Sequence, residues 1–205
     1  MTEERGDNLT LIRNRQFAQL EYGDPFGFLI KLRELEIHVA SSDTDVRIRN
    51  LRSNNLKPVR EMREAALFCV GMSERIGCKV LFAPVEQQDF DFVATFVVAE
   101  CQHFVPVQIK EIVPTHLNNT TSPQHVINGL TKYADSKDLC IAVHLNRVGH
   151  FDPEEICVPD NLFIGELWIF GSINEDQTEW GIWGDFIDLN ENVNGTKFIY
   201  PCVDL

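Results

Sequence analysis

The chain has 205 residues, of which 44% are hydrophobic and 24% are charged, a composition typical of a globular protein large enough for one well-packed domain. No apolar run approaches the roughly 20 residues that a membrane-spanning helix needs, and the charged N-terminal segment lacks the apolar centre of a secretory signal, so we expect a cytoplasmic protein with no membrane partner. The formal net charge of −13 argues against indiscriminate binding to nucleic acid, which depends on clustered lysine and arginine.

The early part of the chain gives a helical pattern only in places. Residues 1–24 mix charged and apolar positions, which fits either a helix or a loosely held arm. Residues 25–39 fit a helix or a strand, because apolar residues in their second half alternate. Residues 58–76 carry apolar side chains at steps of three and four, which predicts an amphipathic helix, and Gly77 is a natural stop after it.

The middle of the chain is rich in predicted strands. Residues 79–84 form the first, and residues 89–114 read as two apolar strands joined by a polar turn at 99–103. Ser122 is a good N-cap for a helix that begins with Pro123. The remaining predicted strands are 138–145, buried on both faces, then 161–173 with a break near Gly165, and finally the edge segments 180–189 and 197–203.

The predicted hairpin of residues 89–114 brings polar side chains to one place. Asp89 and Asp91 open its first strand, and Gln108 and Lys110 lie two residues apart on the second, so that both project from one face. In an antiparallel pair, the start of the first strand lies beside the end of the second. An acid, an amide or backbone oxygen and a lysine at one rim can hold a divalent cation and polarise a phosphate.

The order of the predicted helices and strands is also consistent with a metal site on this hairpin. Residues 58–145 read as helix, strand, strand, strand, helix, strand, which predicts an α/β fold with a mixed central sheet flanked by helices. That order, with an acid opening the second strand and Gln108-Ile109-Lys110 on the third, resembles the PD-(D/E)XK nuclease superfamily in its Gln-x-Lys form. The resemblance implies a restriction-endonuclease-like αβββαβ core at 58–145. Residues 1–57 would then be an N-terminal helical or irregular extension packed on the core, and residues 146–205 a C-terminal β-rich extension of the same domain.

The resemblance also implies a chemistry: phosphodiester hydrolysis of DNA or RNA with Mg²⁺ or Mn²⁺. Asp91, or Asp89 in its place, would bind the metal together with the Ile109 carbonyl and Glu64 from the first helix. Lys110 would be the catalytic cation, and Gln108 would replace an acid, so that the metal is weakly bound. Some members place a Gln or a Tyr on the next helix, where this chain has Gln124 and Tyr133.

Each of these residues also has a plain structural interpretation. Glu64 could pair with Arg60 one helical turn away. Gln124 could belong to the polar first turn of its helix, and Tyr133 could pack between helix and sheet. A buried histidine with a satisfied hydrogen bond is the simplest interpretation of His144.

Charge and aromatic content leave room for other functions. The charge is uneven: the segment after Asp152 is strongly acidic, whereas a basic stretch earlier in the chain contains Arg47, Arg49, Arg52, Lys57, Arg60 and Arg63. They could form a local basic face. The alternative to a nuclease is a catalytically silent nuclease-fold protein that acts as an acidic binding or assembly module, its protein partner meeting the surface around Trp168, Trp180 and Trp183. An acidic immunity protein or DNA mimic is a third interpretation, and a homodimer is compatible with exposed aromatics.

Cysteine and motif patterns suggest no further site. The six cysteines include no C-x-x-C pair, so we expect free thiols, mainly in the core. The sequence contains no H-E-x-x-H, no nucleotide-binding G-x-G-x-x-G and no Walker lysine. The histidines do not form a recognisable ligand set.

Overall fold

The sheet dominates the architecture. A computed structural model describes residues 11–40, 54–85, 87, 89–133, 136–147, 149–188 and 193–202. Within these ranges seven strands form one sheet in chain order. They are β1 (Leu81–Pro84), β2 (Phe92–Val98), β3 (Cys101–Ile112), β4 (Ser136–Leu145), β5 (Ile164–Ser172), β6 (Glu179–Trp183) and β7 (Gly195–Ile199).

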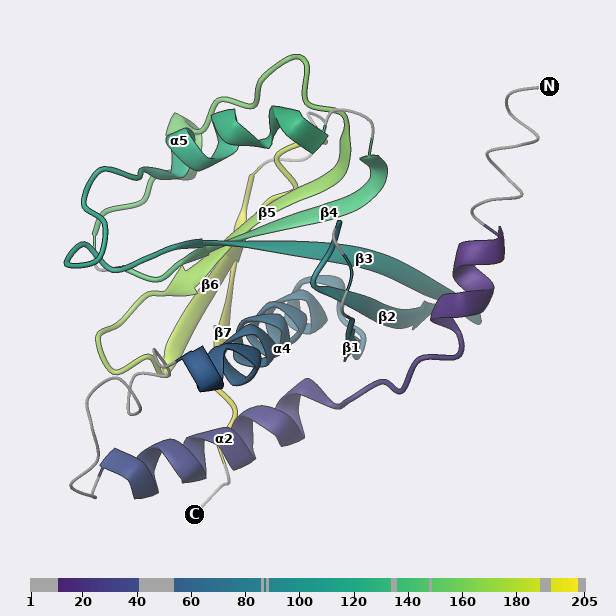
Figure 1. Cartoon of the computed structure of the whole chain (residues 1–205), viewed down its shortest axis with the longest axis horizontal. Helices are drawn as coiled ribbons and strands as arrows, with labels where there is room; N and C mark the ends of the chain where they lie inside the picture. The colour runs from purple at the N-terminus through teal and green to yellow at the C-terminus, as the bar shows by residue number, and fades with distance from the viewer. Residues whose placement is uncertain are drawn as a thin grey trace.

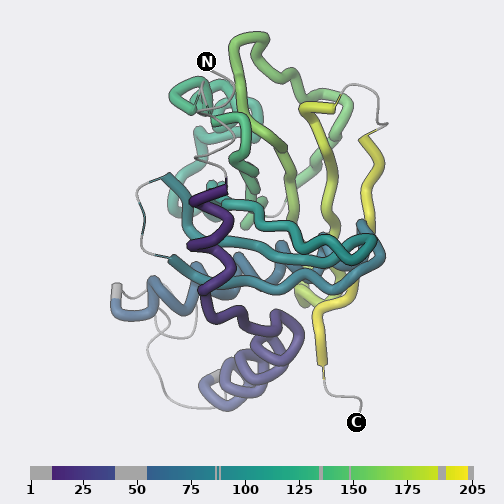
Figure 2. The backbone as a smooth tube through the Cα atoms, turned by 90° about the vertical axis from the view of Figure 1, so that its right-hand side faces the viewer, coloured from purple at the N-terminus to yellow at the C-terminus, as the bar shows by residue number. Residues whose placement is uncertain are grey.

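The sheet is mixed. Strands β1 to β3 are antiparallel neighbours, β3, β4 and β5 are parallel, and β5 to β7 are antiparallel again. It is also strongly curled, so that β1–β3 run across the direction of β5–β7 (Figure 2). The predicted α/β fold with a mixed central sheet flanked by helices is therefore confirmed.

Helices cover both faces of the sheet. The long helix α4 (Lys57–Ile76) crosses one face, and α2 (Pro25–Ala40) packs against the outer side of α4 (Figure 1). The short α5 (Pro123–Asn128) covers the other face next to β3. Residues 11–17 are also helical. The described residues further contain three short 3-10 helices: η1 (Asn54–Leu56), η2 (Gly129–Tyr133) and η3 (Pro153–Glu155).

Two hydrophobic clusters hold these layers together. The cluster on the α4 face is rich in aromatic rings, with Phe68, Phe92 and Phe170 in edge-to-face contact. The cluster on the α5 face is largely aliphatic and includes Ile127 and Ile141. Because side chains alternate along a strand, membership of a cluster tells which face each strand residue occupies.

Local sequence explains where α4 and the β2–β3 hairpin end. Gly77 has a φ of 69° and donates its N–H to the Ser73 carbonyl, which closes α4 as predicted. Ala99 and Glu100, with φ of 49° and 66°, form the tight turn between β2 and β3. The predicted hairpin and the predicted helix over 58–76 are both confirmed.

Several predicted elements differ from the structure. Residues 25–40 are helical, because Leu29 and Leu32 are the buried positions while the alternating Leu35 and Ile37 are 55% and 64% exposed. The helix after Ser122 changes to 3-10 geometry at Gly129. The sixth strand stops at Trp183, well before the predicted end at residue 189, since the chain then turns at Asp185, whose Oδ1 accepts the Leu167 and Ile187 N–H groups. Strand β5 continues through Gly165, but its register with β4 shifts there, between the pairs Ser136↔Ile164 and Cys140↔Glu166.

The cysteines and tryptophans are also placed differently from expectation. All six thiols are free as predicted, but Cys101, Cys157 and Cys202 are exposed rather than in the core. Trp168 and Trp180 are buried, at 6% and 1% exposure, because they pack under α4, and of the three predicted surface tryptophans only Trp183 is half-buried. None of the described helices has the length and apolar character needed to cross a membrane.

Candidate functional site

Strand β3 has an open edge beyond Val107. Strand β2 pairs with β3 from Val98↔Cys101 to Phe92↔Val107 and then leaves it. Asp91, the residue just before β2, occupies the gap, and its Oδ2 accepts the Ile109 N–H at 2.7 Å. The carboxylate thus replaces the missing strand partner for this backbone group.

Gln108 completes a compact polar group at this edge. Its side chain is 7% exposed, and its Nε2 donates both to Asp91 Oδ2 and, at 3.3 Å, to the Ile109 carbonyl. A single NH₂ group therefore lies between a carboxylate oxygen and a backbone oxygen. We refer to Asp91, Gln108, Ile109 and Lys110 as the edge site.

Lys110 contributes positive charge to the edge site. It projects from the same face as Gln108, the α5 face, where its Nζ lies 5.4 Å from the centre of the Tyr133 ring. Burial raises the pKa of the Asp91 carboxyl. The Ile109 N–H, the nearby Lys110 and the Gln108 amide act against that rise, whereas Glu61 on α4 adds to it.

More carboxylates gather on the α4 side of the same edge. A cavity of about 190 Å³, the edge cavity, lies there. It is lined by Arg60, Glu61, Glu64, Asp91, Ile109 and Glu111. Asp91 and Glu64, predicted as metal ligands, thus face one cavity, while Gln108 and Lys110 are not among its lining residues. The predicted residues meet at one strand edge but approach it from both faces of the sheet.

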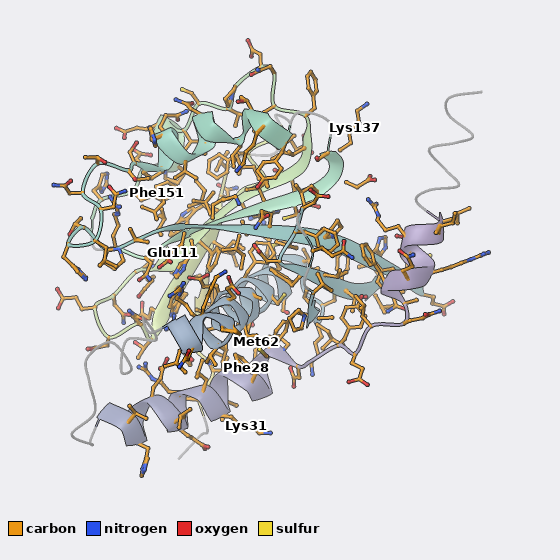
Figure 3. All side chains as sticks on the ribbon, viewed as in Figure 1. Phe28, Lys31, Met62, Glu111, Lys137 and Phe151 are labelled. Carbon is orange, nitrogen blue, oxygen red and sulfur yellow. The ribbon has the colours of Figure 1, made fainter. Side chains whose placement is uncertain are left out.

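Glu64 has other close partners. It is 4% exposed, and its Oε1 lies 3.1 Å from Nδ1 of His144 on β4. Together with Glu111 at the end of β3, which lies above the start of α4 (Figure 3), they form the Glu–Glu–His cluster. One ligand atom from each of the three lies within 4.8 Å of the others. In the described part of the chain, this is the one group of three such side chains close enough to hold a metal ion.

The secondary candidates occupy less central positions. Asp89 is exposed in the segment that leads into β2. Gln124 holds a loop in place, since its amide donates to the Cys157 carbonyl and accepts the Cys157 N–H. Tyr133 contacts Lys110 through its ring face. The basic residues Arg47, Arg49 and Arg52 lie outside the described residues.

Sequence reasoning missed Glu61, Glu111 and His144 as neighbours of the edge site. Glu111 directly follows Lys110, so strand alternation alone sends it to the opposite face, toward α4. Its pairing with His144 depends on the parallel register between β3 and β4, where the two are direct partners. That register brings together residues far apart in the chain, and no local pattern encodes it.

The edge cavity is not the largest hollow of the molecule. A cavity of about 470 Å³ lies farther along the α4 face, lined mostly by apolar side chains together with Glu166, whose carboxyl pKa is raised chiefly by burial. We assign the candidate site by the convergence of oxygen ligands with a lysine, which distinguishes the edge of β3. Comparisons with family models, curated proteins and solved structures found no match for the chain.

Proposed function

We propose that the protein is a divalent-cation-dependent phosphodiester hydrolase of restriction-endonuclease-like architecture that acts on nucleic acid at the edge site. The observation that carries the proposal is the meeting of Asp91, the Gln108 amide and the Ile109 carbonyl at an open strand edge, with Lys110 on the face of Gln108. The element order α4–β1–β2–β3–α5–β4 supports it.

The residues at the edge fit a hard cation. Asp91 Oδ2 and the Ile109 carbonyl already converge on one point, which the Gln108 NH₂ group occupies. Rotating the amide by half a turn would replace its N–H donors with Oε1, so that Asp91, Gln108 and Ile109 would each offer an oxygen to a cation at this edge. Mg²⁺ and Mn²⁺ accept such ligands and keep several waters. Because only Asp91 among these three ligands is charged, the proposed site binds its cation weakly.

The side chains divide the chemistry between them. When bound, the cation would lower the pKa of a coordinated water and offset charge that develops on the phosphate. Asp91 and Gln108 hold the ligand oxygens in position. Lys110 neutralises a non-bridging phosphate oxygen as charge builds up. Tyr133 is a positioning residue, because its ring keeps the Lys110 ammonium at this face of the sheet.

A catalytically silent acidic binding module remains the second candidate. Gln108 in place of an acid favours it, as do the carboxylates of Glu61, Glu64 and Glu111 around the edge cavity, which repel phosphate until a cation binds. The burial of Trp168 and Trp180 leaves only the half-buried Trp183 of the tryptophan surface predicted for such a module.

Cleavage assays separate the two functions. Supercoiled plasmid, single-stranded DNA and RNA are incubated with Mg²⁺, Mn²⁺ or EDTA, and wild type is compared with Asp91→Asn and Lys110→Met. Lys132→Met is the matched control, because Lys132 also lies over the Tyr133 ring, at 5.0 Å, but does not belong to the edge site.

We expect cation-dependent cleavage of at least one substrate, a loss of about 100-fold or more in Asp91→Asn and Lys110→Met, and little change in Lys132→Met. Absence of cleavage by wild type, or equal activity of all four proteins, would reject the hydrolase.

A further inference from the structure

The Glu–Glu–His cluster has the composition of a metal site of a different kind. Its three side chains come from three elements: Glu64 from α4, Glu111 from β3 and His144 from β4. Glu111 and His144 are partners in the parallel register, so they project from the same face, and α4 brings Glu64 onto them. We propose that this cluster binds a transition-metal ion, Zn²⁺ or its analogue Co²⁺, independently of the edge site.

The spacing of the ligand atoms suits one ion. Ligands at about 2.1 Å from a zinc ion lie roughly 3.0–3.4 Å from each other. Glu64 Oε1 and His144 Nδ1 are already 3.1 Å apart, and all three ligand atoms lie within 4.8 Å. A small shift of Glu111, which is only half-buried, brings the third ligand into range.

Burial makes Glu64 an unusual carboxylate. Its neighbour His144 is 1% exposed and stacks on Phe170 at 4.9 Å between ring centres, so the pair lies in apolar surroundings. Glu64 Oε1 accepts the hydrogen bond from His144 Nδ1 at 3.1 Å. Glu64 also lines the edge cavity. A buried carboxylate that lines a cavity is held close to any cation that enters the cavity, and a cation would offset the cost of burying its charge.

The surrounding contacts orient the third ligand. Glu111 Oε1 accepts the Asn146 Nδ2 hydrogen bond at 2.7 Å, and its Oε2 lies 4.0 Å from Arg60 Nε. Such outer contacts hold a carboxylate in one rotamer around a metal. An imidazole with two carboxylates favours zinc, cobalt or manganese over magnesium, which prefers oxygen ligands alone. The cluster and the edge site should therefore select different ions.

The proposal predicts a stabilising role. A metal ion held by α4, β3 and β4 at once would fasten the long helix to the sheet, and it would stabilise the folded state by mass action. This role does not depend on phosphodiester hydrolysis.

Metal titrations of the purified full chain test the proposal. After removal of metals with EDTA, the protein is titrated with Co²⁺ and followed by visible absorption, and Zn²⁺ affinity is measured by competition and by the rise in melting temperature. The test variants are His144→Gln and, should that one fail to fold, Glu111→Gln at the half-buried position. The matched controls are His103→Gln, which changes an exposed strand histidine, and Asp91→Asn.

We expect visible Co²⁺ bands without the charge-transfer absorption of a thiolate ligand, and at least a tenfold loss of Zn²⁺ affinity in His144→Gln and Glu111→Gln. His103→Gln should bind Zn²⁺ like wild type, and Asp91→Asn, which removes no ligand of the cluster, should keep the Co²⁺ bands. Unchanged affinity in the test variants, or no Co²⁺ absorption in wild type, would overturn the proposal. Since Asp91→Asn removes a ligand of the edge site and none of the cluster, failure of the hydrolase and failure of the zinc site give different results.

Discussion

Asp91 is the single residue on which the edge site depends, and its position is costly. Its carboxylate fills a gap in the sheet and is partly withdrawn from water, which raises its pKa. The Ile109 N–H, Lys110 and Gln108 offset only part of the free energy that is lost when the carboxylate is withdrawn from water. A carboxylate kept where it destabilises the fold is typical of functional residues.

The pKa direction of Asp91 predicts how stability changes with pH. An acid whose pKa is raised on folding favours the folded state below its unfolded pKa, and this contribution is lost as the pH rises through the folded pKa. Replacement by asparagine, which can still accept the Ile109 N–H, should therefore stabilise the metal-free protein at neutral pH. The gain should be small because the carboxyl is only half-buried and its charge is still partly solvated.

Thermal melts in EDTA between pH 3 and pH 8 check this expectation. The difference in melting temperature between Asp91→Asn and wild type should be positive at neutral pH and shrink as the pH falls through the Asp91 pKa. A variant that becomes less stable than wild type as the pH rises would contradict the desolvation account.

Some residues of the candidate site could be grouped from the sequence alone, and others could not. Asp91, Gln108 and Lys110 could be grouped in advance because they belong to one hairpin, whose register depends on a local turn. Glu111 and His144 could not, because parallel strands are joined by a long crossover and their register depends on packing of the whole sheet. The role of Glu64 was open for the same reason: its helix position was predictable, but its partner on β4 was not.

Among the elements, α4 is central because it packs on the sheet along its length. Its contact with β7 is close at Gly71, where an added Cβ would lie 2.8 Å from Phe198 Cε1. The periodicity of residues 58–76 predicted this helix well, since one apolar face is buried. The character of residues 25–39 was harder to predict, because α2 buries only a few positions against α4 and leaves apolar residues exposed.

The α4–β7 contact gives a stability prediction. In an exposed helix Gly→Ala stabilises by up to about 1 kcal/mol, but Gly71→Ala should destabilise by about 1–3 kcal/mol because the methyl group collides with Phe198. Gly129→Ala, where nothing lies within 4 Å of the added atom, is the control and should be neutral or stabilising. Urea unfolding measures both. A Gly71→Ala protein as stable as wild type would show that α4 does not approach β7 so closely.

At the scale of the whole molecule, the net charge of −13 determines how a nucleic acid can approach. The described arginines near the edge site are turned toward acids, Arg60 toward Glu111 and Arg63 toward Glu36, and their side chains are 23% and 12% exposed. Arg60 and Arg63 therefore form no exposed basic face, whereas Lys57 is exposed and pairs with Glu61, and Arg47, Arg49 and Arg52 lie outside the described residues. Substrate affinity should then depend on the bound cation.

A binding assay with a fluorescent single-stranded oligonucleotide tests that dependence. In EDTA we expect a Kd weaker than about 10⁻⁴ M, and Ca²⁺, a cation that takes oxygen ligands, should tighten binding at least tenfold. Asp91→Asn should abolish the gain. Tight binding in EDTA would instead place a basic surface elsewhere on the chain.

The cation site at the open edge of β3 is the central claim, and calorimetric titration of Mg²⁺ tests it most directly. The titration is done in the His144→Gln background, which removes the proposed zinc site. One Mg²⁺ should bind weakly to this protein, Asp91→Asn should eliminate the binding, and Gln108→Glu, which adds a second carboxylate, should tighten it about tenfold or more. Mg²⁺ binding that is unaffected by either substitution would contradict the account.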